Sequence, residues 1–430
     1  MGETNKHIYI RGFFRVLLIL LTATTIFGEK HAKAAQPKDT IKQDSLQEKR
    51  VNVYMDCWFC DTDHIKRQID YVNYVRDRQD ADVHIMVTTQ RAANGGRRYS
   101  VFMMGQRGYS HLQDTLRFNV GPNASDEERR QQVLHAFKTG LTPYLLKTPV
   151  WKNLEVEYSK PSEPEETEDK WNYWIFEISS NGSMSGEEST NSYNIGGRIE
   201  ADKVTKDLKL EFDAGGNYNR TIYEVNSKTI TSIHRNYNLQ GLAVKSLSQH
   251  WSAGGSAALL SSRYMNIEVL TSASPGIEFN VFPYSEATTR QLTFLYRPEF
   301  LYAAYEDTTI FNKIREQRFR ERLSIDYEIK KKWGSINFSL NASHYFHDFS
   351  KNRLSFNTSV SLNLVKGLNV NFHGGASLIH DQLSLPKGDA TKEEILTRQQ
   401  QLATDYSYYT RLGISYTFGS TYNNIVNPRF

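Results

Sequence analysis

Two cysteines three residues apart are the first candidates for chemistry in this sequence. Cys57 and Cys60 stand in the run DCWFCD, and the chain contains no other cysteine. Thioredoxin-like folds place such a pair between a strand and a helix for disulfide exchange, with the first cysteine as a low-pKa thiolate. The flanking carboxylates, which would raise a thiol pKa, are Asp56, Asp61 and Asp63. They favour a structural disulfide. Redox exchange, or half of a metal site completed by His64 or Asp63, remains an alternative.

The run IREQRFRER carries a second candidate site. In a strand, Arg318, Arg320 and Arg322 would share one face while Phe319 and Leu323 share the other. On the inner face of a barrel the arginines would form a constriction that favours anions. The favoured alternative is that carboxylates such as Glu299, Glu278 or Asp326 pair with them and plug the interior. Further charged side chains predicted to face the interior are Arg297, Lys209, Glu211 and Asp213.

Histidine and serine fragments suggest a hydrolase at the rim of a barrel. One fragment is His344, His347 and Asp348 in HYFHDF; the other is Ser377, His380 and Asp381. Neither belongs to a G-x-S-x-G elbow, and the sequence has no Walker loop, dinucleotide fingerprint or EF-hand loop. We therefore expect no cofactor and no metal, and keep a rim hydrolase of lipase or protease type as an alternative.

The elements before residue 160 predict a small α/β domain over 50–159. Runs 51–56, 81–89 and 97–105 read as strands, the last two joined across Asn94-Gly95-Gly96, a hairpin signal. Helical spacing covers 61–78, and a second helix begins at a capping box from Ser125 to Glu128. The order is β-α-β-β-α. An acidic segment over 160–170 then reads as a linker.

From Trp171 to 419 the sequence alternates between apolar and polar residues, in about twelve strands spaced at roughly 20 residues, as in transmembrane hairpins. Leu354, Phe356, Val360 and Leu362, for example, share one face of such a strand. Short connections alternate with longer polar ones, such as 181–190 and 348–352. Aromatic residues predicted at the membrane interfaces are Trp171, Trp174, Trp251, Tyr284, Tyr302, Trp333, Tyr416 and Phe418. These features predict a transmembrane antiparallel β-barrel whose apolar face meets lipid; a water-soluble sandwich, which also alternates, is the alternative.

The N-terminus and the composition indicate an exported protein. Basic residues precede the apolar run 16–27, and small residues around Lys33 complete the pattern of a secretory signal over 1–34. An uncleaved anchor helix is the alternative. Residues 35–49 read as a flexible segment and 420–430 as a C-terminal tail. With 52 Lys and Arg against 48 Asp and Glu, the charge predicts no nucleic-acid partner.

The last strand, in LGISYTFGSTYNNIVNPRF, resembles the closing strand of outer-membrane barrels, which is rich in aromatics and often ends in Phe. That resemblance implies barrel insertion machinery and outer-membrane lipid as partners; either Phe418 or Phe430 would carry the signal. The barrel resembles the uncharacterised outer-membrane family that includes salt-induced proteins, and 56–90 is similar to the N-terminal module of fused Bacteroidota-type members. The resemblance implies an outer-membrane location with 50–159 in the periplasm, where a protein partner is possible, and a passive pore or an envelope anchor as function. It implies no known chemistry.

Overall fold

A computed structural model describes residues 50–91, 96–121, 123–155, 157–158, 169–225, 228–388, 401–427 and 429. The predicted signal peptide, the segment 35–49, linker residues 160–168, Asn94-Gly95 and Phe430 lie outside the described residues. Within the described part of the chain, no helix combines the length and apolar character needed to cross a membrane.

The α/β domain is built on a five-stranded sheet with the order β2-β1-β3-β4-β5. β1 pairs in parallel with β2 and β3, and the β3-β4-β5 pairs are antiparallel. Its strands are β1 (Asn52–Asp56), β2 (Asn73–Tyr74), β3 (Val83–Arg91), β4 (Arg97–Gly105) and β5 (Gln113–Val120). Its helices are α2 (Thr62–Gln68) and α3 (Asp126–Leu145), with 3-10 turns η2 (Arg78–Asp80), η3 (Arg107–Tyr109) and η4 (Pro149–Asn153).

Two expectations for this domain were wrong. The helix predicted over 61–78 ends at Gln68, because Ile69 leaves helical geometry and the following chain extends to pair with β1. Ile69 and Val72 are nevertheless buried, so their apolar spacing did not distinguish a helix from the extended segment that the structure contains. Strand β5 was missed; its alternation in QDTLRFNV is interrupted by charged residues on an exposed edge. The capping box of α3 is confirmed: Ser125 Oγ accepts from the Glu128 amide at 3.1 Å, and Glu128 Oε2 accepts from the Ser125 amide at 2.7 Å.

The domain has its own hydrophobic core. α3 packs on β4 and β5, and its Phe137, Leu141 and Tyr144 are each 1% exposed. Val53, Ile85 and Met103 meet them from the sheet and are equally buried. The apolar side chains of 50–155 are therefore shielded from solvent within the domain itself.

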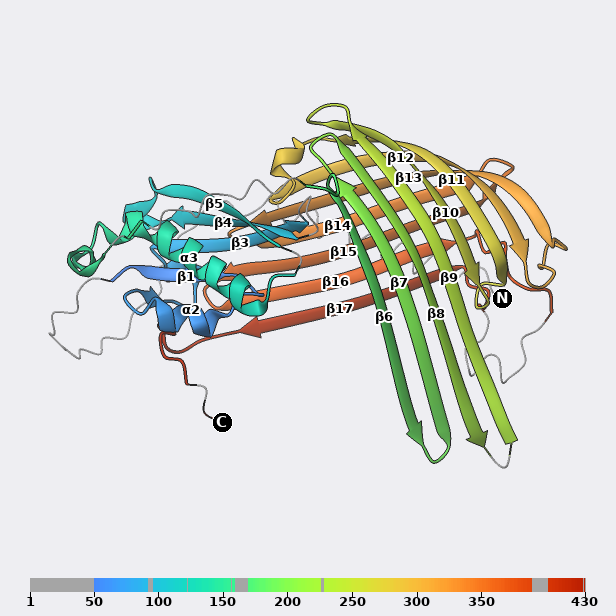
Figure 1. Ribbon diagram of the computed structural model, residues 1–430, viewed down its shortest axis with the longest axis horizontal. Helices are drawn as coiled ribbons and strands as arrows, with labels where there is room; N and C mark the ends of the chain where they lie inside the picture. Colours follow the sequence, from blue (N-terminus) through green and yellow to red (C-terminus); the bar gives the residue numbers. More distant parts are fainter. Residues whose placement is uncertain are drawn as a thin grey trace, which may run out of the picture. The chain divides into compact units, whose positions relative to one another are not determined.

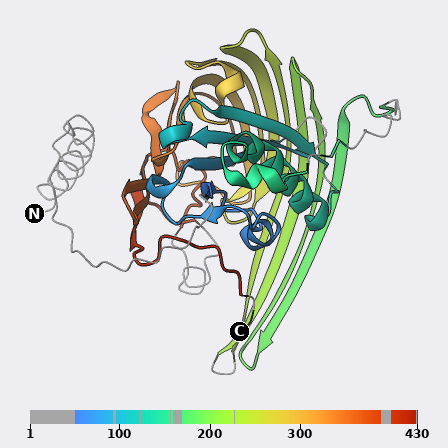
Figure 2. The same ribbon diagram turned by 90° about the vertical axis from the view of Figure 1, so that its left-hand side faces the viewer.

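The second sheet has twelve antiparallel strands in chain order, as Figures 1 and 2 show. The first six strands are β6 (Trp174–Glu187), β7 (Thr190–Val204), β8 (Leu208–Val225), β9 (Lys228–Ser246), β10 (Trp251–Ser262) and β11 (Ile267–Asn280). The next six are β12 (Arg290–Tyr305), β13 (Arg315–Lys331), β14 (Gly334–Tyr345), β15 (Asp348–Val365), β16 (Leu368–Ile379) and β17 (Tyr406–Tyr416). The predicted strand number is confirmed. β6 and β17 form the two edges, and no ladder joins them within the described residues.

Hairpin connections alternate between two ends of this sheet. The proximal end, where the chain enters β6, carries 205–207, 247–250, 281–289, 332–333 and 366–367. The connection 281–289 contains the 3-10 turn η5 (Tyr284–Glu286). The distal end carries 188–189, 263–266, 306–314 and 346–347, together with the described residues 380–388 and 401–405. The expectation of uniformly longer connections at one end was wrong. Segments 181–187 and 348–352, taken from their polarity as loops, continue β6 and β15, because polar residues are tolerated where strands extend.

Candidate functional site

One face of the twelve-stranded sheet carries an arginine–carboxylate network. Arg320 lies directly across from Glu299 on neighbouring strands, and its Nε donates to Glu299 Oε2 at 2.8 Å. Arg322 donates to the same oxygen at 3.3 Å. The Glu299 side chain is 12% exposed and that of Arg320 15%. One carboxylate thus holds two guanidinium groups at low exposure, and the expected pairing of Arg320 and Arg322 with Glu299 is present.

The other residues expected in this network have different partners. Arg318, 8% exposed, pairs with Glu316 on its own strand, and its guanidinium lies over the rings of Tyr305 and Tyr345. Glu278 accepts a hydrogen bond at 2.8 Å from the Tyr284 hydroxyl rather than from an arginine. Burial raises the pKa of Tyr284 to about 12. The register sets Arg297 directly across from Arg322, and no ion pair of Arg297 appears among the described residues.

A second charged cluster lies on strands β7 and β8. Asp213 is 8% exposed; it accepts from Arg198 and, at 2.6 Å, from Asn238. Lys209 pairs with Glu211 at 2.8 Å. Arg91, at the end of β3 in the α/β domain, pairs with Asp202 on β7. The predicted Lys209, Glu211 and Asp213 therefore take part in local ion pairs, and Arg91 is a partner that strand alternation gave no reason to expect.

Three distal connections are tied together by hydrogen bonds. Buried Asn266 donates from Nδ2 to the carbonyls of Asp307 and Ser384, both at 2.9 Å. Segment 381–388 continues this contact: Asp381 pairs with Arg353 at 2.7 Å, and Leu383 is buried against Leu301 and Tyr345. Leu301 and Tyr345 lie on the same face as the arginines, so this segment covers the charged face near the distal end. The alternation of the sequence gave no reason to expect this role of Leu383.

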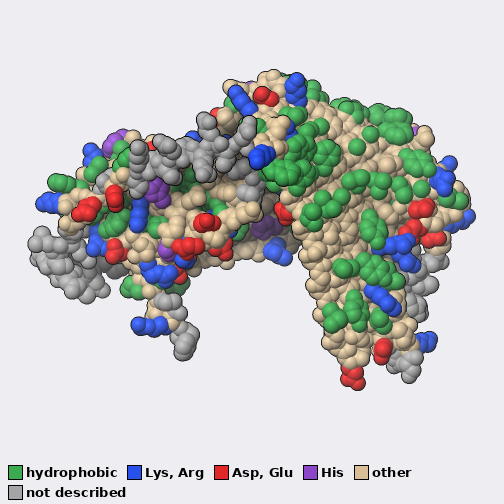
Figure 3. Space-filling model, viewed as in Figure 1, with side chains coloured by type: hydrophobic (Ala, Val, Ile, Leu, Met, Phe, Trp, Pro, Cys, Tyr) green, Lys and Arg blue, Asp and Glu red, His purple; other side chains and the backbone are tan. Residues whose placement is uncertain are grey.

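The opposite face of the sheet is apolar and exposed. Direct cross-strand neighbours form one continuous row over eight strands, β10 to β17. Its members are Ala253, Ile277, Tyr296, Leu323, Ala342, Leu354, Leu378 and Tyr406. Leu354 is 41% exposed and Leu378 45%. Figure 3 shows hydrophobic side chains spread over the visible face of β6 to β10. In the described residues no second layer stacks on this face, so the sandwich alternative has no counterpart in the structure.

Seven of the eight predicted interface aromatics lie at the proximal end of the sheet. They are Trp171, Trp174, Trp251, Tyr284, Trp333, Tyr416 and Phe418. Tyr302 lies toward the distal end of β12. Exposed aromatics near the distal connections that the sequence analysis did not single out include Tyr193, Tyr264, Phe346, Phe349 and Tyr406. Both ends of the apolar face thus carry aromatic side chains.

The cysteines and the rim histidines form no catalytic arrangement in the described residues. Cys57 and Cys60 are joined as a disulfide with sulfurs 1.97 Å apart. His344 Nε2 lies 2.6 Å from Glu321 Oε1, and the ring neighbours of His344 are Phe346 and Phe349. The His347 ring lies against Tyr345. The second proposed fragment is dispersed among three partners: Ser377 bonds Ser355, His380 bonds Asn352, and Asp381 pairs with Arg353. The described residues contain no cluster suited to a metal ion.

The α/β domain contacts the proximal end of the sheet through several hydrogen bonds. The Asp77 carboxylate accepts from the Gly367 amide at 2.6 Å, and Arg78 donates to the Asn363 carbonyl at 2.7 Å. Gly367 has φ +76°, a conformation that suits glycine in this turn. After β17 the chain returns to the domain, where the Asn423 amide donates to the Tyr74 carbonyl at 2.8 Å. The predicted C-terminal tail therefore extends the five-stranded sheet next to β2.

Comparison with known proteins places part of the chain in a family. No curated protein matches it. A solved structure titled "NanC porin structure in rhombohedral crystal form" shares 9% sequence identity with a TM-score of 0.26, over 56% of this chain and 99% of that chain. So low a score carries no argument about fold or function. A family model described as "Protein of unknown function, DUF481" matches residues 178–397, which span β6 to β16 and about half of the chain. The chain therefore belongs to the DUF481 family.

Proposed function

We propose that this protein is an outer-membrane β-barrel that anchors a periplasmic α/β domain and keeps its own interior closed. The observation that carries the proposal is the exposed apolar row from Ala253 to Tyr406. Eight strands about 4.8 Å apart make this row roughly 34 Å wide. Soluble monomers rarely expose apolar patches of more than a few hundred Å². Hydrocarbon is the solvent that such a face suits.

Strand length supports the same proposal. The twelve strands contain 11 to 19 residues each. A tilted strand needs about 9–11 residues to cross a bilayer. Each strand is therefore long enough to cross, and the longer ones extend beyond the hydrocarbon.

Closure of the sheet is part of the proposal. The edge strands β6 and β17 run in clearly different directions in Figure 1, and their outer backbone groups have no ladder partner among the described residues. Lipid cannot satisfy those groups, so a sheet in a membrane must pair its edges. With an even number of antiparallel strands, closing the sheet would bring β6 and β17 together with opposite chain directions, as an antiparallel ladder requires. We propose that they pair in the membrane.

The charged face supports a closed anchor over an open pore. In a closed barrel the network around Glu299 and the segment 381–388 would both lie in the interior. Arg353–Asp381 and buried Leu383 hold that segment at the distal end. The contacts of Asp77 and Arg78 hold the α/β domain at the proximal end. The domain would then face the periplasm, where residues 50–159 are available to a partner protein.

Two measurements test this function. Cell fractionation should find the protein in the outer membrane, and unboiled protein should migrate differently from boiled protein, because closed barrels resist detergent until heated. A soluble fraction without heat-dependent mobility would overturn the membrane assignment.

Planar-bilayer recording of the refolded protein distinguishes the anchor from the pore. The wild type should give no ion-current steps, whereas a variant lacking 381–388 with Glu299→Ala should give them. Steps from the wild type would establish the passive pore instead. If both proteins stay silent while both show heat-dependent mobility, the proposed position of 381–388 in the interior is wrong.

A further inference from the structure

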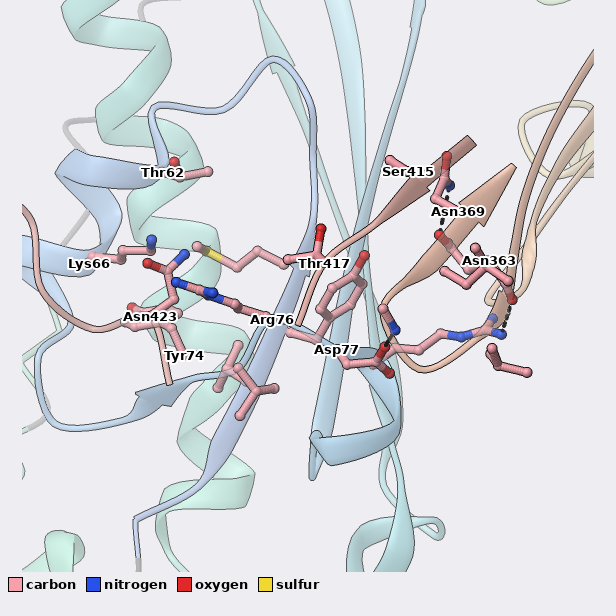
Figure 4. Close-up of a pocket in the computed structure, with 18 residues that line it drawn as sticks. Thr62, Lys66, Tyr74, Arg76, Asp77, Asn363, Asn369, Ser415, Thr417 and Asn423 are labelled. Carbon is pink, nitrogen blue, oxygen red and sulfur yellow. Dashed lines mark hydrogen bonds between the residues drawn. The ribbon is translucent and has the colours of Figure 1, made fainter. Parts of the chain in front are cut away.

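A pocket at the junction of the α/β domain and the twelve-stranded sheet has no role in the anchor function. Its volume is about 450 Å³, within the range of small-molecule sites. Figure 4 shows side chains from helix α2, from the chain after β2, from the β15–β16 hairpin and from the segment after β17 around it. Strand β1 also lines the pocket, through Val53, Tyr54 and Met55, so five separate parts of the chain meet around one space.

Lys66 is the unusual residue of this pocket. It lies on α2, lines the pocket and is only 9% exposed. No carboxylate among the described residues lies within ion-pair distance of its ammonium group. Burial lowers the pKa of Lys66; Asp63 raises that pKa and Arg76 lowers it. The Lys66 side chain is therefore largely buried without a carboxylate partner, which is costly for an ammonium group and raises the question of what offsets that cost.

A second cation and several donors lie beside Lys66. Figure 4 shows Arg76 and Asn423 on the same side of the pocket as Lys66. No side-chain partner of Arg76 or Asn423 appears within the described part of the chain. The hydroxyl groups of Ser415 and Thr417 line the pocket and likewise have no recorded partner there.

The other charged residues of the pocket are already paired. Asp77 accepts from the amides of Gly367 and Gln79, at 2.6 and 2.8 Å. Arg78 donates to the Asn363 carbonyl at 2.7 Å. The groups of the pocket without a protein partner in the described residues are therefore the largely buried Lys66 and the exposed Arg76, with neutral donors beside them, and together they suit an anion.

We propose that this pocket binds a phosphate monoester, with Lys66 and Arg76 contacting the phosphate. A phosphate monoester carries about two negative charges at neutral pH on three oxygens. Lys66 and Arg76 lie on one side of the pocket, so both ligand charges must sit at one place. A dicarboxylate separates its charges along a carbon chain and fits this arrangement less well. The remaining volume accommodates the organic part of the ester.

Calorimetric titration of the full-length refolded protein with glycerol 3-phosphate tests the proposal. The wild type should bind it at least 10-fold more tightly than succinate. Lys66→Met and Arg76→Gln should each weaken binding at least 10-fold, and Lys66→Arg should restore part of it. Lys138→Met, which removes an exposed ammonium from α3, is the matched control and should bind like the wild type.

The thermal midpoint of the same variants gives a second readout. Because Lys66 is buried without a partner, Lys66→Met should raise the midpoint of the ligand-free protein while abolishing its increase on addition of glycerol 3-phosphate. A lower midpoint for ligand-free Lys66→Met, together with unchanged ligand binding, would mean a structural role and would overturn the proposal. Equal affinity for glycerol 3-phosphate in Arg76→Gln and the wild type would overturn it as well.

Phosphate esters occur free and in lipid headgroups, and a competition experiment separates the two sources. If phosphatidic acid vesicles compete with glycerol 3-phosphate and control vesicles of phosphatidylcholine do not, the ligand is the lipid headgroup. Failure of the vesicles to compete would identify a soluble ester. Absence of binding to both, in protein that shows heat-dependent mobility, would overturn the inference and leave the barrel assignment intact.

Discussion

The α/β domain and the twelve-stranded sheet arrange the same residue types in opposite ways. In the domain, Phe137 and Leu141 are buried and charged residues lie outside. In the sheet, Phe319 is 58% exposed, while Arg318 on the other face is 8% exposed. One chain therefore contains a region that buries its apolar side chains and a region that exposes them.

The two regions also differ in how they satisfy their polar groups. The α/β domain closes its backbone bonds within one small sheet and two helices. The twelve-stranded sheet leaves its two edges unpaired within the described residues and pairs charges across one face, as Glu299 does with Arg320 and Arg322. The first arrangement suffices in water, whereas the proposed barrel would need a bilayer and pairing of its two edges.

Replacing one phenylalanine in each region should give the largest contrast. Phe137→Ala leaves a cavity in the α/β core and should lower the free energy of unfolding of that domain by about 4 kcal/mol. Phe319→Ala should leave the free energy of unfolding of the α/β domain unchanged within about 0.5 kcal/mol. The measurement is urea-dependent protease cleavage within 50–155 of protein in lipid vesicles. Equal effects of the two substitutions would remove the distinction between the regions.

An arginine on each face of the sheet sharpens the comparison. Leu323→Arg puts a charge on the apolar face and should cost about 3 kcal/mol in a bilayer. Asn337→Arg, on the other face and directly across from Glu328, should change stability by less than about 1 kcal/mol. The folded fraction in urea, read from gel mobility of unheated samples, measures both. A neutral Leu323→Arg would mean that this face meets water.

The charged face can be tested at its centre. Glu299→Gln leaves Arg320 and Arg322 without their shared carboxylate and should cost about 2 kcal/mol. Glu278→Gln is the matched change, since Glu278 accepts from a single neutral hydroxyl, and should cost about half as much. The same gel assay reports both variants. The network has no stabilising role if the order of the two effects is reversed.

The sequence predicted most where one periodicity dominates. In Leu354, Phe356, Val360 and Leu362, strict alternation gave both the strand and the shared face, because a strand has no other way to separate apolar from polar residues. The arginine–glutamate pair of 320 and 299 followed from the same alternation. The strand number was right for that reason, and the capping box at Ser125 was right because it is a local signal.

The errors arose where contacts between distant residues decide the structure. Ile69 and Val72 have helical spacing but belong to a chain that extends to pair with β1. Polarity suggested loops at 181–187 and 348–352, where pairing with the neighbouring strand maintains the ladder. The pocket around Lys66 joins residues as far apart in the sequence as Val53 and Asn423, and no spacing in the sequence indicates it.

High pH should weaken the α/β domain in a way that depends on Tyr144. Its hydroxyl donates to the Leu112 carbonyl at 2.9 Å, and burial, followed by the charge of Asp114, raises its pKa to about 12. The folded state holds the Tyr144 proton more tightly than the unfolded state does. The contribution of this group to the free energy of unfolding is therefore complete below pH 10 and is lost between pH 10 and 12. We expect a loss of about 1 kcal/mol between pH 10 and 11, and a smaller loss in Tyr144→Phe. Urea midpoints by proteolysis at pH 8, 10 and 11 measure it; equal slopes in both proteins would contradict this role of Tyr144.

The contact between the two regions should give the smallest effect. Asp77→Asn keeps an oxygen that can accept from the Gly367 amide but removes the charge that strengthens the bond. It should lower the stability of the α/β domain by about 0.5–1 kcal/mol. Asp114→Asn is the matched control, because Asp114 also accepts from a backbone amide, that of Thr115, but within its own strand. If the sheet supports the domain through Asp77, cutting the chain in the linker 160–168 and removing the sheet should abolish the effect of Asp77→Asn and preserve that of Asp114→Asn. If the effect of Asp77→Asn survives removal of the sheet, it comes from the bond to the Gln79 amide alone. The two regions would then be independent at this contact.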